Sequence, residues 1–510
     1  MVIYTITNLL MSCHRSARGI QEPQADAITD KASAKANTEE YNTIIENDFV
    51  SPIKQPLSTF SIDVDEAAYS NVRRYIQGGQ LPPKDAVRIE EMINYFDYTY
   101  PQPSNNEPFS VNTEMATCPW NPNHKLVHIG LQGKSIAKEN LPASNLVFLI
   151  DVSGSMDEPN KLPLVKASLK MLTEQLRGED KVAIVVYAGN AGLVLPSTKG
   201  NNKNKIKEAI EALNAGGSTA GGEGIQLAYK VALENFKSKG NNRVILCSDG
   251  DFNVGLSSEN ELVSLIEKER KSGIYLTVLG YGMGNYKDNK MQQLADKGNG
   301  NHAYIDNMNE ARKVLINEFG GTLFTIAKDV KLQVEFNPTY VQAYRLIGYE
   351  NRLLAAEDFN DDQKDAGELG AGHTVTALYE IIPIGIKNEF EKPVDKLKYQ
   401  AETSSSKGFG TELMNIKLRY KLPKEEESKL ITHPVEMSTL SYEGSSSNFR
   451  FAAAVAEFGL LLRTSAYKQL STYQQVIELA KQSKGEDAEG YRSEFVQLVQ
   501  TASALDKTNK

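Results

Sequence analysis

The stretch 145–156, NLVFLIDVSGSM, constrains the fold most, because an unbroken apolar run stops abruptly at oxygen-bearing side chains. Residues 146–150 have the length and composition of a strand buried on both faces. Asp151, Ser153 and Ser155 follow at once. Open α/β sheets bind their ligands at the carboxyl ends of such strands. Carboxylate and hydroxyl oxygens suit Mg²⁺, Mn²⁺ or Ca²⁺ better than zinc, so the stretch predicts a site for a hard cation.

Two later loops offer further oxygen ligands for the same site. Thr219 lies in the glycine-rich stretch 214–224, NAGGSTAGGEG, and Asp249 directly follows a second apolar strand pattern at 243–248. Each feature also has a simpler interpretation: Asp151 with its serines could cap a helix, Thr219 could be ordinary loop polarity, and Asp249 could belong to a turn. Because all three features occur in order, each on the expected element, we favour the metal site.

The order of these residues resembles the metal-ion-dependent adhesion site of von Willebrand factor type A domains, over roughly residues 144–325. The resemblance implies that one divalent cation, Mg²⁺ or alternatively Mn²⁺ or Ca²⁺, is held by Asp151, Ser153, Ser155, Thr219 and Asp249. It also implies a protein partner whose Asp or Glu carboxylate fills the open coordination position. The expected function is divalent-metal-dependent protein binding, as an adhesion or scaffold module.

The pattern of the whole chain predicts a doubly wound, Rossmann-like α/β domain associated with antiparallel strands. In 144–325, strand patterns alternate with helical patterns, which is typical of a parallel sheet. Strands without crossover helices occur in 49–136, beside two helical patterns, and in 326–422. The α/β domain is therefore expected to be inserted in, or flanked by, an antiparallel β-sandwich. Residues 423–510 are predicted to be helical.

The parts before and after the α/β domain also resemble known sequences. Residues 49–101 resemble an N-terminal extension found in a group of bacterial type A domain proteins, and the part after Phe324 resembles the uncharacterised C-terminal domain of the same group. Asp63 and Asp65 form an Asp-x-Asp pair that could bind a cation. A cap by Asp65 on the helix that follows is the interpretation we favour.

Cys13 ends the sequence LMSC, which resembles the lipobox of bacterial lipoproteins. The resemblance implies that Cys13 is lipidated and that residues 1–13 are the signal, although this segment is short and lacks basic residues before the cysteine. A cysteine placed there by chance is the alternative. Residues 14–48 are polar and are predicted to form a flexible tether. We expect a lipoprotein of the cell envelope whose lipid is its only membrane contact, because no other run could span a bilayer.

Composition and motifs argue against nucleic-acid binding and against catalysis. The formal net charge of −9 lacks the basic excess typical of nucleic-acid-binding proteins. The sequence has no GxSxG nucleophile elbow and no GxxxxGK[ST] phosphate loop, and its six histidines are scattered. We therefore predict a binding protein and not an enzyme. The alternatives are a purely structural metal site, with binding by the β-rich and helical regions, and a metal-dependent hydrolase.

Overall fold

The computed structural model describes residues 39–104, 107–217, 221–250, 259–318, 324–390 and 410–506. Cys13, the expected signal at 1–13 and Thr219 lie outside the described residues. The lipid anchor and the fifth metal ligand therefore stay predictions.

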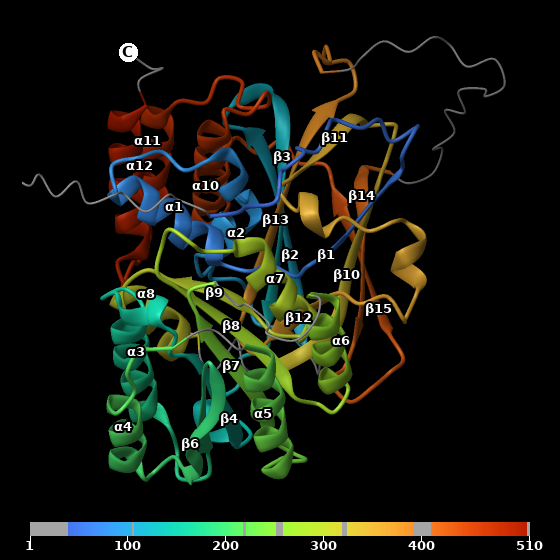
Figure 1. Cartoon of the computed structure of the whole chain (residues 1–510). Helices are drawn as coiled ribbons and strands as arrows, with labels where there is room; N and C mark the ends of the chain where they lie inside the picture. Colours follow the sequence, from blue (N-terminus) through green and yellow to red (C-terminus); the bar gives the residue numbers. More distant parts are fainter. Residues whose placement is uncertain are drawn as a thin grey trace, which may run out of the picture. The chain divides into compact units, whose positions relative to one another are not determined.

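A six-stranded sheet forms the α/β domain, in the order β6-β5-β4-β7-β8-β9 (Figure 1). Five strands run parallel, and β6 returns antiparallel beside β5. The turn into β6 needs Gly189, whose φ of 73° lies in the left-handed region. The strands are β4 (Ser144–Asp151), β5 (Lys181–Ala188), β6 (Asn190–Lys199), β7 (Asn241–Ser248), β8 (Tyr275–Tyr281) and β9 (His302–Ile305). The predicted doubly wound domain is confirmed.

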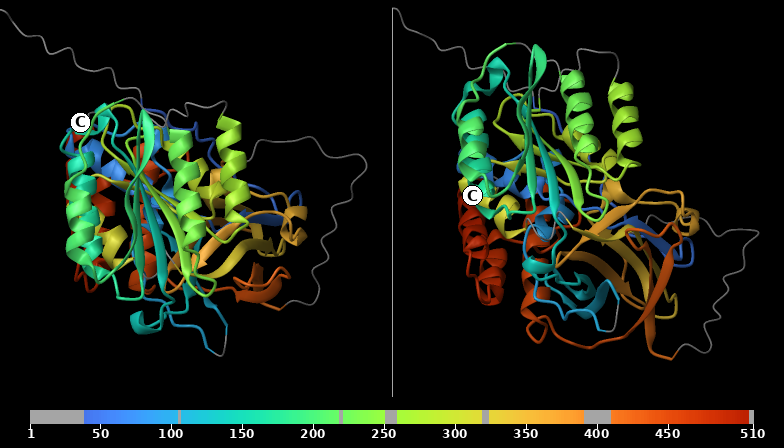
Figure 2. Two further views of the ribbon diagram at one scale, coloured as in Figure 1. Left: turned by 60° about the horizontal axis from the view of Figure 1, so that its bottom comes forward. Right: turned by 90° about the horizontal axis from the view of Figure 1, so that it is seen from below.

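Helices cover both faces of this sheet, which explains why β4 is apolar without alternation (Figure 2). Phe148 packs with residues of α3 and α4 on one face, whereas Val147 and Leu149 pack with residues of α5, α6 and α7 on the other. Burying each such side chain stabilises the fold by about 1.5–3 kcal/mol. The helices are α3 (Leu162–Gln175), α4 (Lys203–Glu211), α5 (Gly221–Glu234), α6 (Glu259–Arg270), α7 (Asp288–Lys297) and α8 (Met308–Arg312). A π-helical turn, η4 (Lys313–Asn317), continues α8.

Two antiparallel sheets form a β-sandwich. One has the order β11-β13-β3-β2, and the other has the order β1-β10-β14-β15 with β12 paired to β10. Their facing side chains share one core, which includes Phe60, Val127, Leu332 and Tyr379. The strands are β1 (Leu57–Ser61), β2 (Phe109–Cys118), β3 (Asn121–Gly133), β10 (Thr325–Phe336), β11 (Val341–Ile347), β12 (Gly367–Gly370), β13 (Thr374–Pro383), β14 (Glu412–Lys421) and β15 (Lys429–Glu436).

Strand pairing shows how the α/β domain relates to this sandwich. β3 and β13 are neighbours, with Gln132 opposite Thr374 and Lys125 opposite Ile381, although the whole α/β domain separates them in sequence. β1 and β10 pair in the same way across the domain. The α/β domain is therefore an insertion in the sandwich, which is one of the two arrangements that its strand patterns predict.

A helical layer packs on the four-stranded sheet of the sandwich. Its core contains Leu378 from that sheet and Trp120 from the turn between β2 and β3, together with side chains of the N-terminal and C-terminal helices. The hydroxyl of Ser446 caps α10 by accepting a hydrogen bond from the N–H of Phe449 at 3.1 Å. The helices are α1 (Ala67–Gln77), α2 (Ile89–Asn94), α10 (Ser447–Arg463), α11 (Tyr473–Ser483) and α12 (Tyr491–Leu505). A helical C-terminal region is therefore present.

The start of that region differs from the prediction. The sequence places it at 423, but β15 lies there and pairs antiparallel with β14. Most side chains of β15 are exposed, as on an edge strand. Such a strand lacks the buried apolar alternation by which strands are recognised, so the sequence pattern does not reveal it.

Candidate metal centre

Asp151 and Asp249 meet because they stand at the ends of neighbouring parallel strands. Asp151 is the last residue of β4, and Asp249 directly follows β7. The register places Ile150 opposite Cys247, which brings both strand ends to one edge of the sheet. Both carboxylates are fully buried. Two buried carboxylates at one sheet edge need positive charge or several hydrogen-bond donors.

Two serine hydroxyls lie beside these carboxylates. Ser153 Oγ and Ser155 Oγ are 3.1 Å apart, and the backbone N–H of Ser153 donates to Asp151 Oδ1 at 2.9 Å. The hydroxyl of Ser155 also forms a hydrogen bond with Asp249. The structure therefore brings together Asp151, Ser153, Ser155 and Asp249, the four described members of the predicted set.

Asp151 is held by hydroxyl groups and has a raised pKa. Tyr187 OH and Ser248 Oγ donate to its Oδ2 at 3.1 and 3.2 Å. Burial raises the pKa of Asp151 to about 6, the negative charge of Asp249 adds to the rise, and the hydrogen bonds only partly oppose it. The ionised carboxylate is thus held in place with little compensation of its charge.

Asp249 has a different environment. Lys161 Nζ and Asn285 Nδ2 donate to its Oδ2 at 2.8 and 3.0 Å. Burial acts to raise the pKa of Asp249, but the hydrogen bonds from Lys161 and Asn285 and the lysine charge outweigh it, so the pKa lies below its usual value. The two carboxylates therefore differ: Asp249 is paired with a cation of the protein, whereas Asp151 has no cationic partner among the described residues.

The described residues just before Thr219 contact the loop that carries Ser153. The N–H of Gly216 donates to the carbonyl of Val152 at 2.7 Å, and the N–H of Gly154 donates to the carbonyl of Gly217 at 3.2 Å. Thr219 itself lies outside the described residues, so its role as a ligand stays a prediction.

The donor set fits a hard divalent cation. Two carboxylates and two hydroxyls are the oxygen ligands that Mg²⁺ and Ca²⁺ prefer. In the part of the chain that the structure describes, no three His, Cys, Asp or Glu side chains gather as a metal site. A zinc centre built on such residues is therefore not seen there, and a cation at this edge would depend on the serines as well as the carboxylates.

Lys161 and Asn285 are the site residues that the sequence interpretation misses. Lys161 immediately precedes the apolar pattern of α3, where a lysine is normally assigned to the surface. Asn285 lies in the glycine-rich loop after the apolar strand β8. Loops that follow apolar strands supplied the other candidates, so the same signal could have included Asn285.

The N-terminal segment contacts the loop that carries Asn285. Glu39 Oε1 accepts from the N–H of Gly284 at 2.8 Å, and Glu39 also binds Arg74 through both its oxygens at 2.9 and 2.8 Å. Glu40 Oε1 pairs with Lys287 Nζ at 2.7 Å. The prediction of a flexible tether over 14–48 is therefore wrong for its last residues, because specific ionic contacts hold them.

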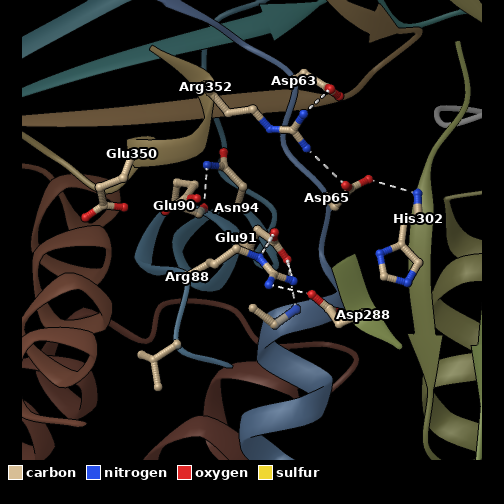
Figure 3. A network of polar contacts seen from close by, with 12 residues as sticks. Asp63, Asp65, Arg88, Glu90, Glu91, Asn94, Asp288, His302, Glu350 and Arg352 are labelled. Atoms are coloured by element: carbon tan, nitrogen blue, oxygen red, sulfur yellow. Dashed lines mark hydrogen bonds and ion pairs between the residues drawn. The ribbon is translucent and has the colours of Figure 1, made fainter. Parts of the chain in front are cut away.

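Asp63 and Asp65 bind a cation of the protein itself (Figure 3). Arg352 donates to Asp63 Oδ2 at 2.8 Å and to Asp65 Oδ2 at 3.2 Å. Asp65 Oδ1 accepts from the backbone N–H of His302 at 2.8 Å. The side chain of Asp65 does not cap α1, whose N-cap is Glu66. The favoured helix-cap interpretation is therefore wrong. The guanidinium of Arg352 occupies the position that the alternative interpretation gave to a metal ion.

Three parts of the chain match known families. Residues 35–128 match a family described as von Willebrand factor, 145–317 match the von Willebrand factor type A domain, and 321–505 match the C-terminal region of uncharacterized protein YfbK. Among the described residues, no helix combines the length and apolar character needed to cross a membrane.

Individual proteins are similar to this chain over part or most of its length. A UPF0353 protein of Mycolicibacterium gilvum is 28% identical over 220 residues, which cover 40% of this chain and 61% of that protein. A solved structure of a von Willebrand factor type A protein from Catenulispora acidiphila is 16% identical, with a TM-score of 0.42, and covers 78% of this chain and 91% of that chain. Uncharacterized protein YfbK of Escherichia coli K12 is 44% identical over 491 residues, which cover 94% of this chain and 84% of that protein. The chain therefore belongs to the YfbK family of bacterial proteins, with a von Willebrand factor type A domain at its centre.

Proposed function

We propose that this protein binds a protein partner through a divalent cation at the edge of the α/β sheet. The observation that carries the proposal is the convergence of Asp151, Ser153, Ser155 and Asp249 from two neighbouring strand ends. Type A domains commonly mediate metal-dependent protein interactions, which agrees with this donor set.

Each residue has a defined task in the proposed centre. Ser153 and Ser155 offer adjacent hydroxyl oxygens. Tyr187 and Ser248 orient Asp151, whereas Lys161 and Asn285 orient Asp249. A bound Mg²⁺, or Mn²⁺ or Ca²⁺, would supply a coordination position for an Asp or Glu carboxylate of the partner. Thr219 is proposed as the fifth ligand of this chain.

Binding fits the site better than hydrolysis does. The described partners of the two carboxylates are serine, tyrosine, asparagine and lysine side chains. None of these is a histidine or a third carboxylate that would serve as general base beside the serines. The proposal therefore assigns no catalytic role to Ser153 or Ser155.

We also propose that the protein acts at the bacterial cell envelope, anchored by a lipid on Cys13. The sequence LMSC supports this anchor. Metabolic labelling with a fatty-acid analogue tests it: the intact chain is expected to be labelled and Cys13→Ala is not. Equal labelling of both chains would exclude Cys13 as the lipidation site.

To test the binding proposal, the full chain is immobilised on a resin and incubated with envelope extract. Capture of a partner is expected in Mg²⁺ and is expected to be lost in EDTA and with Asp151→Ala. The matched control is Asp157→Ala, which removes an exposed carboxylate six residues further along the same loop and is expected to bind normally. Capture that survives both EDTA and Asp151→Ala would reject the cation as the contact.

A structural role of the cation predicts a different outcome. Thr219→Ala is expected to weaken capture while the melting temperature in Mg²⁺ changes little. A fall in melting temperature with unchanged capture would instead favour a cation that only ties the loops together.

A further inference from the structure

Lys161 places a positive charge inside the candidate metal centre. It lies between η3 (Gly154–Asp157) and α3, and its side chain is buried. Its ammonium donates to Asp249 Oδ2 at 2.8 Å and to Asn285 Oδ1 at 3.2 Å. The lysine therefore neutralises one of the two carboxylates that would bind the cation.

The surrounding backbone is shaped to hold this lysine. Gly282 has a φ of 77°, and a Cβ atom at this position would lie 2.4 Å from Lys161 Cε and 2.6 Å from its Cγ. Glycine is thus needed both for the backbone conformation and for the space that the lysine stem fills. The N–H of Lys161 donates to the carbonyl of Glu158 at 2.9 Å, which anchors its backbone. The backbone and the side chain of Lys161 are consequently both held in place at the centre.

The lysine changes the charge balance of the centre. Without it, Asp151 and Asp249 would present two negative charges to a divalent cation. With it, one of these charges is already compensated, and the ammonium also repels an incoming cation. A third carboxylate from outside the chain would restore the missing negative charge.

We propose that Lys161 is a resident counter-ion that makes binding of the cation and binding of a partner carboxylate depend on each other. This inference rests on the proposed function. The free chain then binds the cation weakly, and the cation is held tightly only together with the partner's Asp or Glu. Because such coupling is reciprocal, the cation raises the affinity for the carboxylate by the same factor.

The test is calorimetric titration of the full chain with Mg²⁺. Lys161→Met removes the charge, and Lys161→Gln removes the charge but keeps an N–H donor for Asp249. Both variants are expected to bind Mg²⁺ at least about tenfold more tightly than the natural chain. Lys170→Met is the matched control, because Lys170 lies on α3, the helix that directly follows Lys161, is partly exposed and pairs with Glu211 away from the centre. It is expected to bind Mg²⁺ like the natural chain.

A second titration, in sodium acetate and in sodium chloride of equal ionic strength, measures the coupling itself. Acetate is expected to raise the Mg²⁺ affinity of the natural chain by a larger factor than that of Lys161→Met. Equal factors would overturn the inference.

The outcomes separate this inference from the function on which it rests. If the natural chain binds Mg²⁺ and both Lys161 variants bind it equally or more weakly, the inference fails and the proposed function stands. If no chain binds Mg²⁺, both fail. If both variants lose their cooperative unfolding transition, Lys161 serves the fold and the inference is overturned. If only one variant loses its cooperative unfolding transition, the Mg²⁺ affinity of the other variant tests the inference.

Discussion

Glu457 is a carboxylic acid inside α10, and burial raises its pKa to about 8. An unfolded glutamate has a pKa of about 4.3. The folded chain therefore binds this proton more tightly than the unfolded chain does. The stabilising contribution of Glu457 is complete below about pH 4 and is lost as the pH rises through about 8. At neutral and alkaline pH, the burial of Glu457 is thus expected to lower the free energy of unfolding.

Glu457→Gln should remove that cost. Relative to the natural chain, the free energy of unfolding of the variant is expected to increase by about 4 kcal/mol as the pH rises from 5 to 9. Urea denaturation of both chains at pH 5, 7 and 9 measures the difference. Glu478→Gln makes the same change on the exposed face of α11 and should leave the pH profile unaltered. Parallel profiles for Glu457→Gln and the natural chain would show that the carboxyl is not protonated in the fold.

The end of the α/β domain is clamped by a helix from the N-terminal extension. Arg73 of α1 binds Asp306, just before α8, at 2.5 and 2.9 Å, and binds Glu310 in α8 at 2.7 Å. Tyr95 OH also donates to Glu310 at 2.8 Å. Arg73, Asp306 and Glu310 are almost completely buried. Two elements far apart in sequence are therefore joined by desolvated charges that depend on one another.

Arg73→Met tests this clamp. The variant leaves two buried carboxylates without their main partner, so its free energy of unfolding should fall by about 3–5 kcal/mol. Guanidinium denaturation followed by circular dichroism measures the loss. Arg270→Met removes a half-exposed pair with Asp365 and should cost no more than about 1 kcal/mol. Similar losses for both variants would mean that the clamp contributes no more than a surface ion pair.

The helical layer joins the two ends of the chain into one core. Side chains of α1 and α2 pack with those of α10, α11 and α12 and with one face of the sandwich. α10 contributes the fully buried Phe449, Phe451, Val455 and Phe458. Burying each of these stabilises the fold by about 1.5–3 kcal/mol, and their sum is comparable to the net stability of a whole domain.

A chain ending at Met437 should therefore fail to fold cooperatively. Loss of α10 to α12 would expose the apolar sides of α1, α2 and the four-stranded sheet. The expected signs are a broad thermal transition and strong binding of the dye ANS. A chain ending at Asp506 keeps all described helices and should melt like the full chain. One sharp transition without dye binding in the shorter chain would show that the C-terminal helices are dispensable.

The parallel, doubly wound sheet and two carboxylates of the candidate centre could be predicted because their signals are local. The apolar runs before Asp151 and Asp249 identify buried strands, and the carboxyl ends of parallel strands share one edge. The association of the α/β domain with a sandwich was also predictable, since the strands on both sides lack crossover helices, whereas the pairing of β3 with β13 was needed to show an insertion. β15 was missed because an exposed edge strand carries little apolar alternation.

Several buried charged side chains, in the site and elsewhere, could not be predicted in the same way. Lys161 precedes an amphipathic helix and Arg73 lies within one, where charged residues normally face solvent. Glu39 belongs to a polar segment whose composition is typical of disorder. Each becomes a buried partner only after distant elements pack against it.

Apolar periodicity along the chain was enough to specify the strands of the α/β domain and the strand ends where oxygen ligands gather, because these features follow from neighbouring residues. Packing between distant segments was needed to pair Lys161 with Asp249, Arg352 with Asp63 and Asp65, and Arg73 with Asp306. The physical reason is that a charge is accepted in the interior only when its counter-charge arrives there too, and that meeting depends on the fold as a whole.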